Sequence, residues 1–118
     1  MRPETKNLLE YLMIPRCSND YWLLGGAIDI ATVRCLEFKP IVINEVCDEL
    51  MREGHGNSRN AIDRRLRRAL ERLIYREDVV RERVARMLWH EISGTVPLQE
   101  FLYAAVRCVK SSERRGGM

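Results

Sequence analysis

The sequence has no long hydrophobic run: none of its apolar stretches reaches the roughly 18 residues that a membrane-spanning helix requires. Its first residues, MRPETKNLLEYL, also lack the charged and then apolar segments of a signal peptide. We therefore expect a cytoplasmic protein that makes no contact with a membrane. The hydrophobic fraction of 46% is nevertheless sufficient for one compact core.

Residues that form metal sites and catalytic centres are scarce as well. His55 and His90 are the only histidines, and neither is spaced from a cysteine or a carboxylate as in a zinc site. No nucleophile–base pair, carboxylate dyad or phosphate-binding loop is recognisable. We therefore predict that the protein is not an enzyme, with no catalytic residue, no metal site, no cofactor and no small-molecule substrate.

The four cysteines are widely separated and form no CxxC pair. Apolar neighbours in predicted helices favour buried, reduced thiols, and a disulfide or a metal site is the alternative. The cysteines are Cys17, Cys35, Cys47 and Cys108.

Apolar residues recur with the helical period along the chain, and no alternating strand pattern is present. This pattern predicts an all-α protein, a compact bundle of about six helices. We expect one domain over residues 1–110 and a disordered tail over residues 111–118. The expected helices cover residues 5–13, 20–36, 40–53, 58–75, 77–92 and 97–110.

The expected helix 20–36 is apolar nearly all round, Trp22 and Val33 included, which is typical of the most buried helix of a bundle. Gly25 and Gly26 lie inside it, where a glycine costs about 1 kcal/mol relative to alanine. We expect the close approach of a neighbouring helix to offset this cost; a break at the glycines is the alternative.

Basic residues are concentrated in one segment. Residues 57–76, NSRNAIDRRLRRALERLIYR, contain seven arginines and two acids, a net charge of +5, whereas the other 98 residues sum to −2. Of the 20 basic residues, 17 are arginine. Arginine matches phosphate and guanine better than lysine does, although codon bias can produce the same ratio.

The expected helices 40–53 and 58–75 are joined by a short glycine turn over residues 54–57, as in a helix–turn–helix. A helical projection of the second helix places an apolar stripe on one side, with Arg64 and Arg68 almost opposite. The stripe consists of Ile62, Leu66, Ala69, Leu70 and Leu73.

Such a helix suits the major groove of double-stranded DNA, which admits one α-helix and displays acceptor pairs that a guanidinium matches. Residues in the first two turns normally reach base edges, and later arginines meet phosphates. The candidates for base contact are Asn60, Asp63, Arg64 and Arg67. The candidates for phosphate contact are Asn57, Ser58, Arg59, Arg65, Arg68 and Arg72.

An ordinary solvated helix is the alternative. Asp63 and Arg67 have the spacing of a helix-surface ion pair, which contributes about 0.2–0.5 kcal/mol, and Asp63 could instead orient Arg64 or accept from cytosine. Two acids cannot pair locally with seven arginines, however, so an anionic partner is the economical explanation.

The chain contains, in this order, LLEYLMIP, YWLLGGAIDIATV, IDRRLRRALERLI and PLQEFLYAAV. Together these segments resemble the C-terminal DNA-binding effector domain of the stage 0 sporulation response regulator, the master sporulation transcription factor of spore-forming Firmicutes, and the resemblance covers roughly residues 5–109. The third segment is the most similar, to the family's V-E-R-A-I-R-H-A-I-E recognition helix.

The resemblance implies a six-helix bundle whose third and fourth helices form a helix–turn–helix that binds short boxes upstream of regulated genes, as tandem or dimeric copies. It places the family's base-reading acid on Asp63 and its two arginines on Arg64 and Arg67. Ala61 stands where the family has a further arginine, which Arg59 or Asn60 could replace, and the turn is several residues longer. The family's receiver domain does not precede this segment, as in an excised piece or a free-standing relative.

We therefore expect a sequence-specific DNA-binding transcription regulator, with double-stranded DNA as its partner and binding as a homodimer or in tandem. The alternative is a helical interaction module that binds an acidic protein or modulates a related regulator. The longer turn and Ala61 favour this alternative.

Overall fold

The computed structural model describes the backbone of residues 1–116 and the side chains of residues 1–112. The expected all-α class and the number of helices are confirmed, and no strand occurs within residues 1–116. The helices are α1 (Pro3–Tyr11), α2 (Asn19–Leu36), α3 (Ile43–Arg52), α4 (Arg59–Arg76), α5 (Asp78–Leu88) and α6 (Leu98–Gly116).

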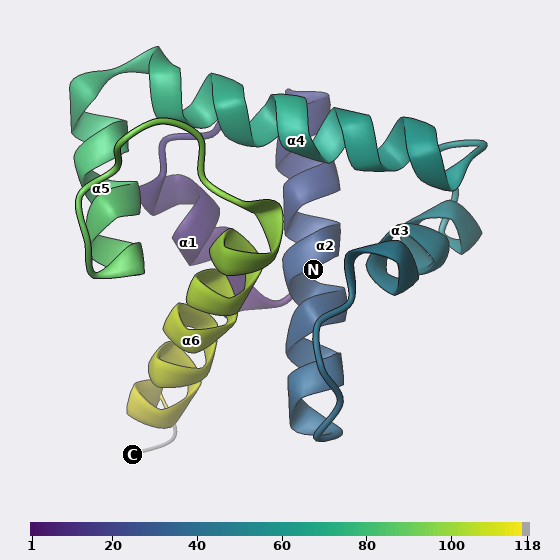
Figure 1. Cartoon of the computed structure of the whole chain (residues 1–118). Coiled ribbons are helices and arrows are strands. Elements are labelled where there is room, and N and C mark those ends of the chain that lie inside the picture. The colour runs from purple at the N-terminus through teal and green to yellow at the C-terminus, as the bar shows by residue number, and fades with distance from the viewer. Residues whose placement is uncertain (117–118) are drawn as a thin grey trace.

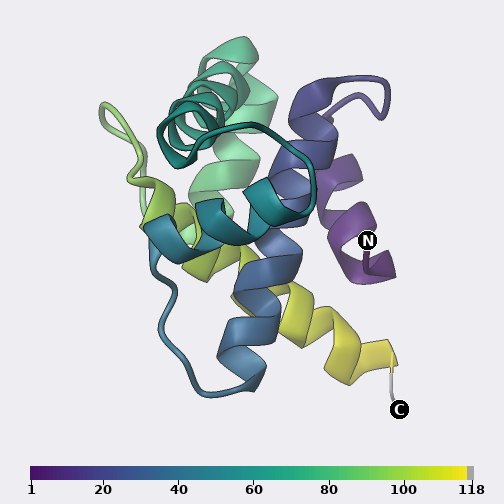
Figure 2. The same cartoon turned by 90° about the vertical axis from the view of Figure 1, so that its right-hand side faces the viewer.

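The bundle is organised around α2, which packs against α1, α3, α4 and α6. In Figure 1, α4 lies across one end of α2, with α3 beneath its start and α5 beneath its end. Figure 2 gives the view along α4, which forms one edge of the molecule. The buried apolar side chains of all six helices make one continuous cluster.

Local sequence sets the start of α2 and of α4. The Oγ atoms of Ser18 and Ser58 accept hydrogen bonds from the backbone N–H groups of Tyr21 (3.2 Å) and Ala61 (3.1 Å). Each hydroxyl therefore satisfies a donor that the first helical turn leaves unpaired.

The glycines of α2 lie at the expected close approaches, and the helix does not break there. A Cβ atom on Gly25 would lie 3.0 Å from Cδ1 of Leu9 on α1. A Cβ atom on Gly26 would lie 3.0 Å from Cδ2 of Leu50 on α3. The two small residues thus let α1 and α3 pack directly against the backbone of α2.

The expectation that α2 is buried nearly all round is wrong at three apolar positions. Trp22 is 51% exposed, Val33 42% and Leu36 47%, although the rest of the helix packs as the central element. An apolar composition does not show which side chains the neighbouring helices cover, because four helices cannot surround a fifth completely.

Several helix boundaries also differ from those expected. The third helix begins at Ile43 rather than at Pro40, because Ile41 is held in an extended segment: its N–H donates to Oη of Tyr103 (3.0 Å) and its carbonyl accepts from Nε2 of Gln99 (2.7 Å). The fifth helix ends at Leu88, where Trp89 adopts a left-handed conformation with φ of 62°.

The third difference concerns the C-terminus. Residues 111–116, expected to belong to a disordered tail, continue α6 to Gly116, and residues 117–118 lie outside the described part. The first helix is also shifted by two residues toward the N-terminus, since Pro3 stands in its first turn. None of the helices in the described part of the chain is both long and apolar enough to cross a membrane.

All four cysteines are free, but they are not uniformly buried. Cys47 is buried, and desolvation raises the pKa of its thiol to about 11, so it stays protonated. Cys35 and Cys108 are partly buried, whereas Cys17 is exposed, contrary to expectation. Cys17 lies in the turn between α1 and α2, outside the helices that form the core.

Candidate nucleic-acid interface

The candidate interface is built on α3 and α4, which pack against each other and are separated by residues 53–58. Gly54 has a φ of +87°, a left-handed conformation that favours glycine and ends α3. The turn then presses onto α4: a Cβ atom on Gly56 would lie 2.8 Å from Cγ1 of Ile62. The glycines therefore permit the tight return of the chain.

The apolar stripe of α4 is buried as expected. Ile62 and Leu66 are 0% exposed, and Leu70 is 2% exposed. Ala69 and Leu73 are also buried, and Ile74 joins them. This stripe fixes which side of α4 faces the core, so the rotation of the helix about its axis matches the helical projection.

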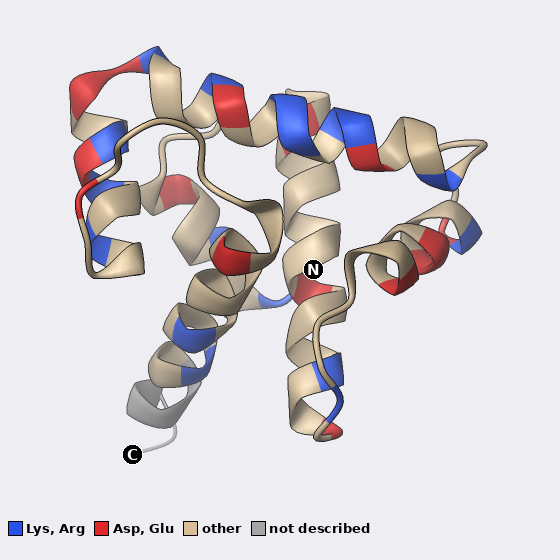
Figure 3. Ribbon diagram, viewed as in Figure 1, with Lys and Arg blue, Asp and Glu red and all other residues tan. Residues whose placement is uncertain are grey.

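On the opposite side of α4, Arg64 and Arg68 are exposed. Figure 3 shows basic segments along the whole length of α4, at an edge of the molecule. Arg64 makes one long contact, from Nε to the carbonyl oxygen of Asn60 (3.5 Å). Arg68 has no hydrogen bond or ion pair with the described part of the protein. Both guanidinium groups are therefore available to an external anion.

Two other arginines of α4 are held by carboxylates of neighbouring helices. Nε and Nη2 of Arg59 donate to Oδ1 (2.8 Å) and Oδ2 (2.7 Å) of Asp48 on α3. Nε and Nη2 of Arg72 donate to Oδ2 (2.9 Å) and Oδ1 (2.7 Å) of Asp20 on α2. In both pairs a planar guanidinium meets a carboxylate through two parallel hydrogen bonds, the strongest geometry for such a pair.

The hydrogen bonds of these pairs shift the pKa values of Asp48, Arg59 and Arg72. The hydrogen bonds from Arg59 hold the pKa of Asp48 below its usual value, and those bonds raise the pKa of Arg59. The hydrogen bonds from Arg72 to Asp20 likewise raise the pKa of the guanidinium. Asp48, Arg59 and Arg72 are thus charged at neutral pH.

The other three arginines of α4 donate to Asp63 or to backbone carbonyl oxygens in two turns. Nε of Arg67 donates to both carboxylate oxygens of Asp63, at 3.1 and 3.2 Å. Arg65 donates to the carbonyl oxygen of His55 in the turn, and Nη1 of Arg76 to that of Met13 (2.9 Å). Of the two arginines that Asp63 could orient, it holds Arg67.

The predicted contact residues therefore fall into two groups. Asn57, Asn60, Arg64 and Arg68 are exposed and lack charged partners in the described part of the chain. Ser58, Arg59, Arg65, Arg67 and Arg72 already make hydrogen bonds within the protein, as does Asp63.

Sequence reasoning missed the carboxylates of Asp20 and Asp48. It compared the seven arginines with the two acids of the same segment, although two further acids reach α4 from α2 and α3. Asp20 and Arg72 are 52 residues apart in the chain, and no spacing pattern links them. The local excess of positive charge is thus smaller than expected and lies mainly between the two pairs, with Arg76 beyond them.

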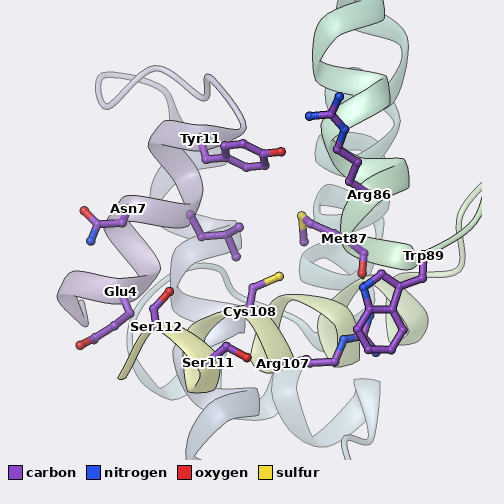
Figure 4. A pocket seen from close by; sticks show the side chains of 11 residues that line it. Glu4, Asn7, Tyr11, Arg86, Met87, Trp89, Arg107, Cys108, Ser111 and Ser112 are labelled. Carbon is purple, nitrogen blue, oxygen red and sulfur yellow. The ribbon is translucent and has the colours of Figure 1, made fainter. Parts of the chain in front are cut away.

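A second feature missed by sequence reasoning is a hollow of about 450 Å³ between α1, α5 and α6. Figure 4 shows Tyr11 and Arg86 pointing into it from two sides, with Trp89 and Arg107 at one end. The guanidinium carbon of Arg107 lies 3.7 Å from the centre of the Trp89 ring, and Nη2 donates to the carbonyl oxygen of Met87 (2.6 Å). Trp89 nevertheless remains 77% exposed.

Comparisons of the chain with protein-family models, curated proteins and solved structures gave no match. The functional argument therefore rests on the residues and geometry described above.

Proposed function

We propose that the protein is a sequence-specific DNA-binding transcription regulator in which α3 and α4 act as a helix–turn–helix and α4 enters the major groove. The observation that carries the proposal is the outer side of α4: Arg64 and Arg68 are exposed and have no carboxylate partner among the described residues, directly opposite a buried stripe. A rigidly anchored helix with open guanidinium groups matches both the width of the groove and its acceptors.

In this proposal the early residues of α4 read bases. Arg64 donates to a guanine, and Arg67 does the same while Asp63 orients it, consistent with the hydrogen bonds between these two side chains. Asn60, one turn before Arg64, contacts the adjacent base edge. Arg68, one turn later, contacts a phosphate.

The turn before α4 would lie along the phosphate backbone. Asn57 is exposed there, and the backbone N–H groups at the start of α4 face outward with the positive end of the helix dipole. Ser58 and Arg65 serve α4 itself, through the cap and the bond to the turn, so their part is to hold the helix start in place. The resemblance to the sporulation regulator's effector domain supports the same use of these two helices.

A salt titration on random duplex DNA tests the proposed function. Each phosphate contact contributes about −0.9 to the slope of log K against log salt, so several contacts give a steep decline. The double variant Arg64→Ala/Arg68→Ala should lose most of this binding. Arg86→Ala on α5 is the matched control and should bind as the unaltered protein does. Absence of binding at about 50 mM salt would refute the proposal.

Selection from random duplexes addresses the target. An enriched motif would support sequence-specific recognition, and an inverted or direct repeat within it would distinguish a homodimer from tandem copies.

A second candidate function is a helical interaction module, which the hollow between α1, α5 and α6 favours. Trp89 is exposed in a conformation that suits glycine, and Arg86 and Arg107 place positive charge beside it. An aromatic ring flanked by arginines is typical of a protein-binding surface. The chain has two tryptophans, so in the variant Trp22→Phe the fluorescence of Trp89 would report binding of a related regulator's effector domain. No spectral change would remove this candidate.

A further inference from the structure

We infer that Asp20 and Asp48 are positioning residues that determine specificity. They orient α4 and withhold Arg72 and Arg59 from DNA. The exposed side chains of Arg64 and Arg68 are then left to contact DNA. This inference rests on the proposed DNA binding and concerns the same surface. Neither aspartate belongs to α4, and each forms two hydrogen bonds with one of its arginines.

The two ion pairs hold α4 at two points along its length. Arg59 and Arg72 are 13 residues apart, about 20 Å along the helix axis, and are tied to two different helices. The apolar stripe of α4 packs against the core. The ion pairs of Arg59 and Arg72 oppose rotation of α4 about its axis and its translation along that axis. The direction in which Arg64 and Arg68 project is therefore set at both ends.

The two ion pairs also lower the net positive charge that α4 presents. Each aspartate neutralises one guanidinium, so the uncompensated positive charge of α4 lies mainly between the two pairs, with Arg76 beyond them. Phosphate contacts supply most of the affinity for any DNA sequence, whereas base contacts distinguish sequences. Withholding two arginines from phosphates thus lowers the affinity for all DNA sequences alike, so the base contacts that the two pairs hold in position decide which duplex is bound.

The variants Asp20→Asn and Asp48→Asn test this, because each keeps the size of the side chain and removes its charge. Glu71→Gln is the matched control: Glu71 is an exposed acid of α4 that forms no ion pair with the described residues. The dissociation constants for random duplex and for the selected duplex are measured across a range of salt concentrations. Thermal unfolding followed by circular dichroism verifies that the variants are folded, as expected for partly exposed pairs.

Each aspartate variant should bind random duplex about three- to tenfold more tightly, with a salt slope steeper by about one contact, and should discriminate less against it. Glu71→Gln should change the discrimination by less than about twofold. Asp48→Glu, which restores the charge, should recover discrimination. A merely structural pair would change the unfolding temperature without changing the salt slope.

Three results would overturn the inference. If Glu71→Gln reproduces the aspartate variants, net charge alone accounts for the effect. If the aspartate variants bind random DNA no more tightly, Arg59 and Arg72 are not withheld. In both cases the unaltered protein still binds its selected duplex, so the proposed function stands. If the unaltered protein binds no DNA, the proposed function fails and the inference fails with it.

Discussion

The helices α4 and α5 both carry several arginines, but they use them differently. On α5, Arg81 lies over the ring of Tyr75 (5.8 Å) and donates to the carbonyl oxygen of Ile92 (2.8 Å). Arg83 lies over the ring of Tyr11 (4.8 Å) and donates to that residue's carbonyl oxygen (2.6 Å). These arginines join neighbouring elements through aromatic rings and backbone oxygens.

On α4, by contrast, arginines at the two ends pair with carboxylates, and Arg64 and Arg68 in the middle have no charged partner. The number of arginines therefore does not identify an anion-binding surface. What identifies it is which guanidinium groups keep free donors after the tertiary structure has formed, because an arginine whose Nε and Nη2 both donate to a carboxylate has fewer donors and less uncompensated charge for DNA.

The largest expected effect breaks the anchoring of α4. Leu66→Ala should lower the free energy of unfolding by about 2–5 kcal/mol, because it leaves a cavity beneath the helix. Chemical denaturation measures this change. The solvent-facing variant Arg68→Ala should stay within about 0.5 kcal/mol of the unaltered protein. Equal losses in the two variants would mean that the sides of α4 are assigned wrongly.

The next largest effect separates base contact from phosphate contact. Arg64→Ala should lose about 1–3 kcal/mol of binding free energy for the selected duplex and relax the preference at one base pair, because a bidentate contact with guanine is removed. Competition binding with single-base variants of the duplex measures this. An unchanged base preference would contradict the assignment of Arg64.

Arg68→Ala should act more weakly and on all sequences alike. We expect about a three- to tenfold loss of affinity and a salt slope reduced by about one, because one phosphate contact disappears. Titrations of random and selected duplexes at several salt concentrations test the expectation. A loss confined to the selected duplex would assign Arg68 to a base instead.

A variant of Arg107, which lies on α6 and contacts α5, tests an arginine outside α4. Arg107→Gln removes the contact with the Trp89 ring and the hydrogen bond to Met87, and should lower the free energy of unfolding by about 0.5–1 kcal/mol. Affinity for DNA should not change. A loss of affinity comparable to that of Arg64→Ala would place the hollow, rather than α4, in the DNA interface.

The smallest expected effect is a pH dependence at the connection between α5 and α6. Nε2 of His90 lies 2.5 Å from Oε1 of Glu100, and hydrogen bonds to the carbonyl of Glu91 and to Glu100 raise the pKa of His90 above 6.5. A raised pKa means that the folded protein binds the proton more tightly. The resulting stability is fully present below about pH 6.5 and is lost as the pH rises through the folded-state value.

Melting temperatures measured from pH 5 to pH 9 should therefore show a slight decline above neutrality. His90→Gln should remove that decline. The same decline in the variant would show that another group is responsible.

Most of the fold follows from local patterns. The helical period predicted six helices, and Gly25 and Gly26 marked close approaches. Boundaries failed where tertiary contacts intervened. Ile41 is kept extended by Tyr103 and Gln99 on α6, and a distant partner of this kind leaves no trace in the local pattern.

For the candidate interface, the sequence by itself determined the two sides of α4, because a period of 3.6 residues places Leu66 and Arg64 on opposite faces of any helix. The packing of the helices determines which of these arginines pair with a carboxylate of another helix. Asp20 and Asp48 come from α2 and α3, and folding brings their carboxylates within hydrogen-bond distance of α4. Charge interactions depend on distance in space, and residues far apart in the chain become neighbours only when the helices pack.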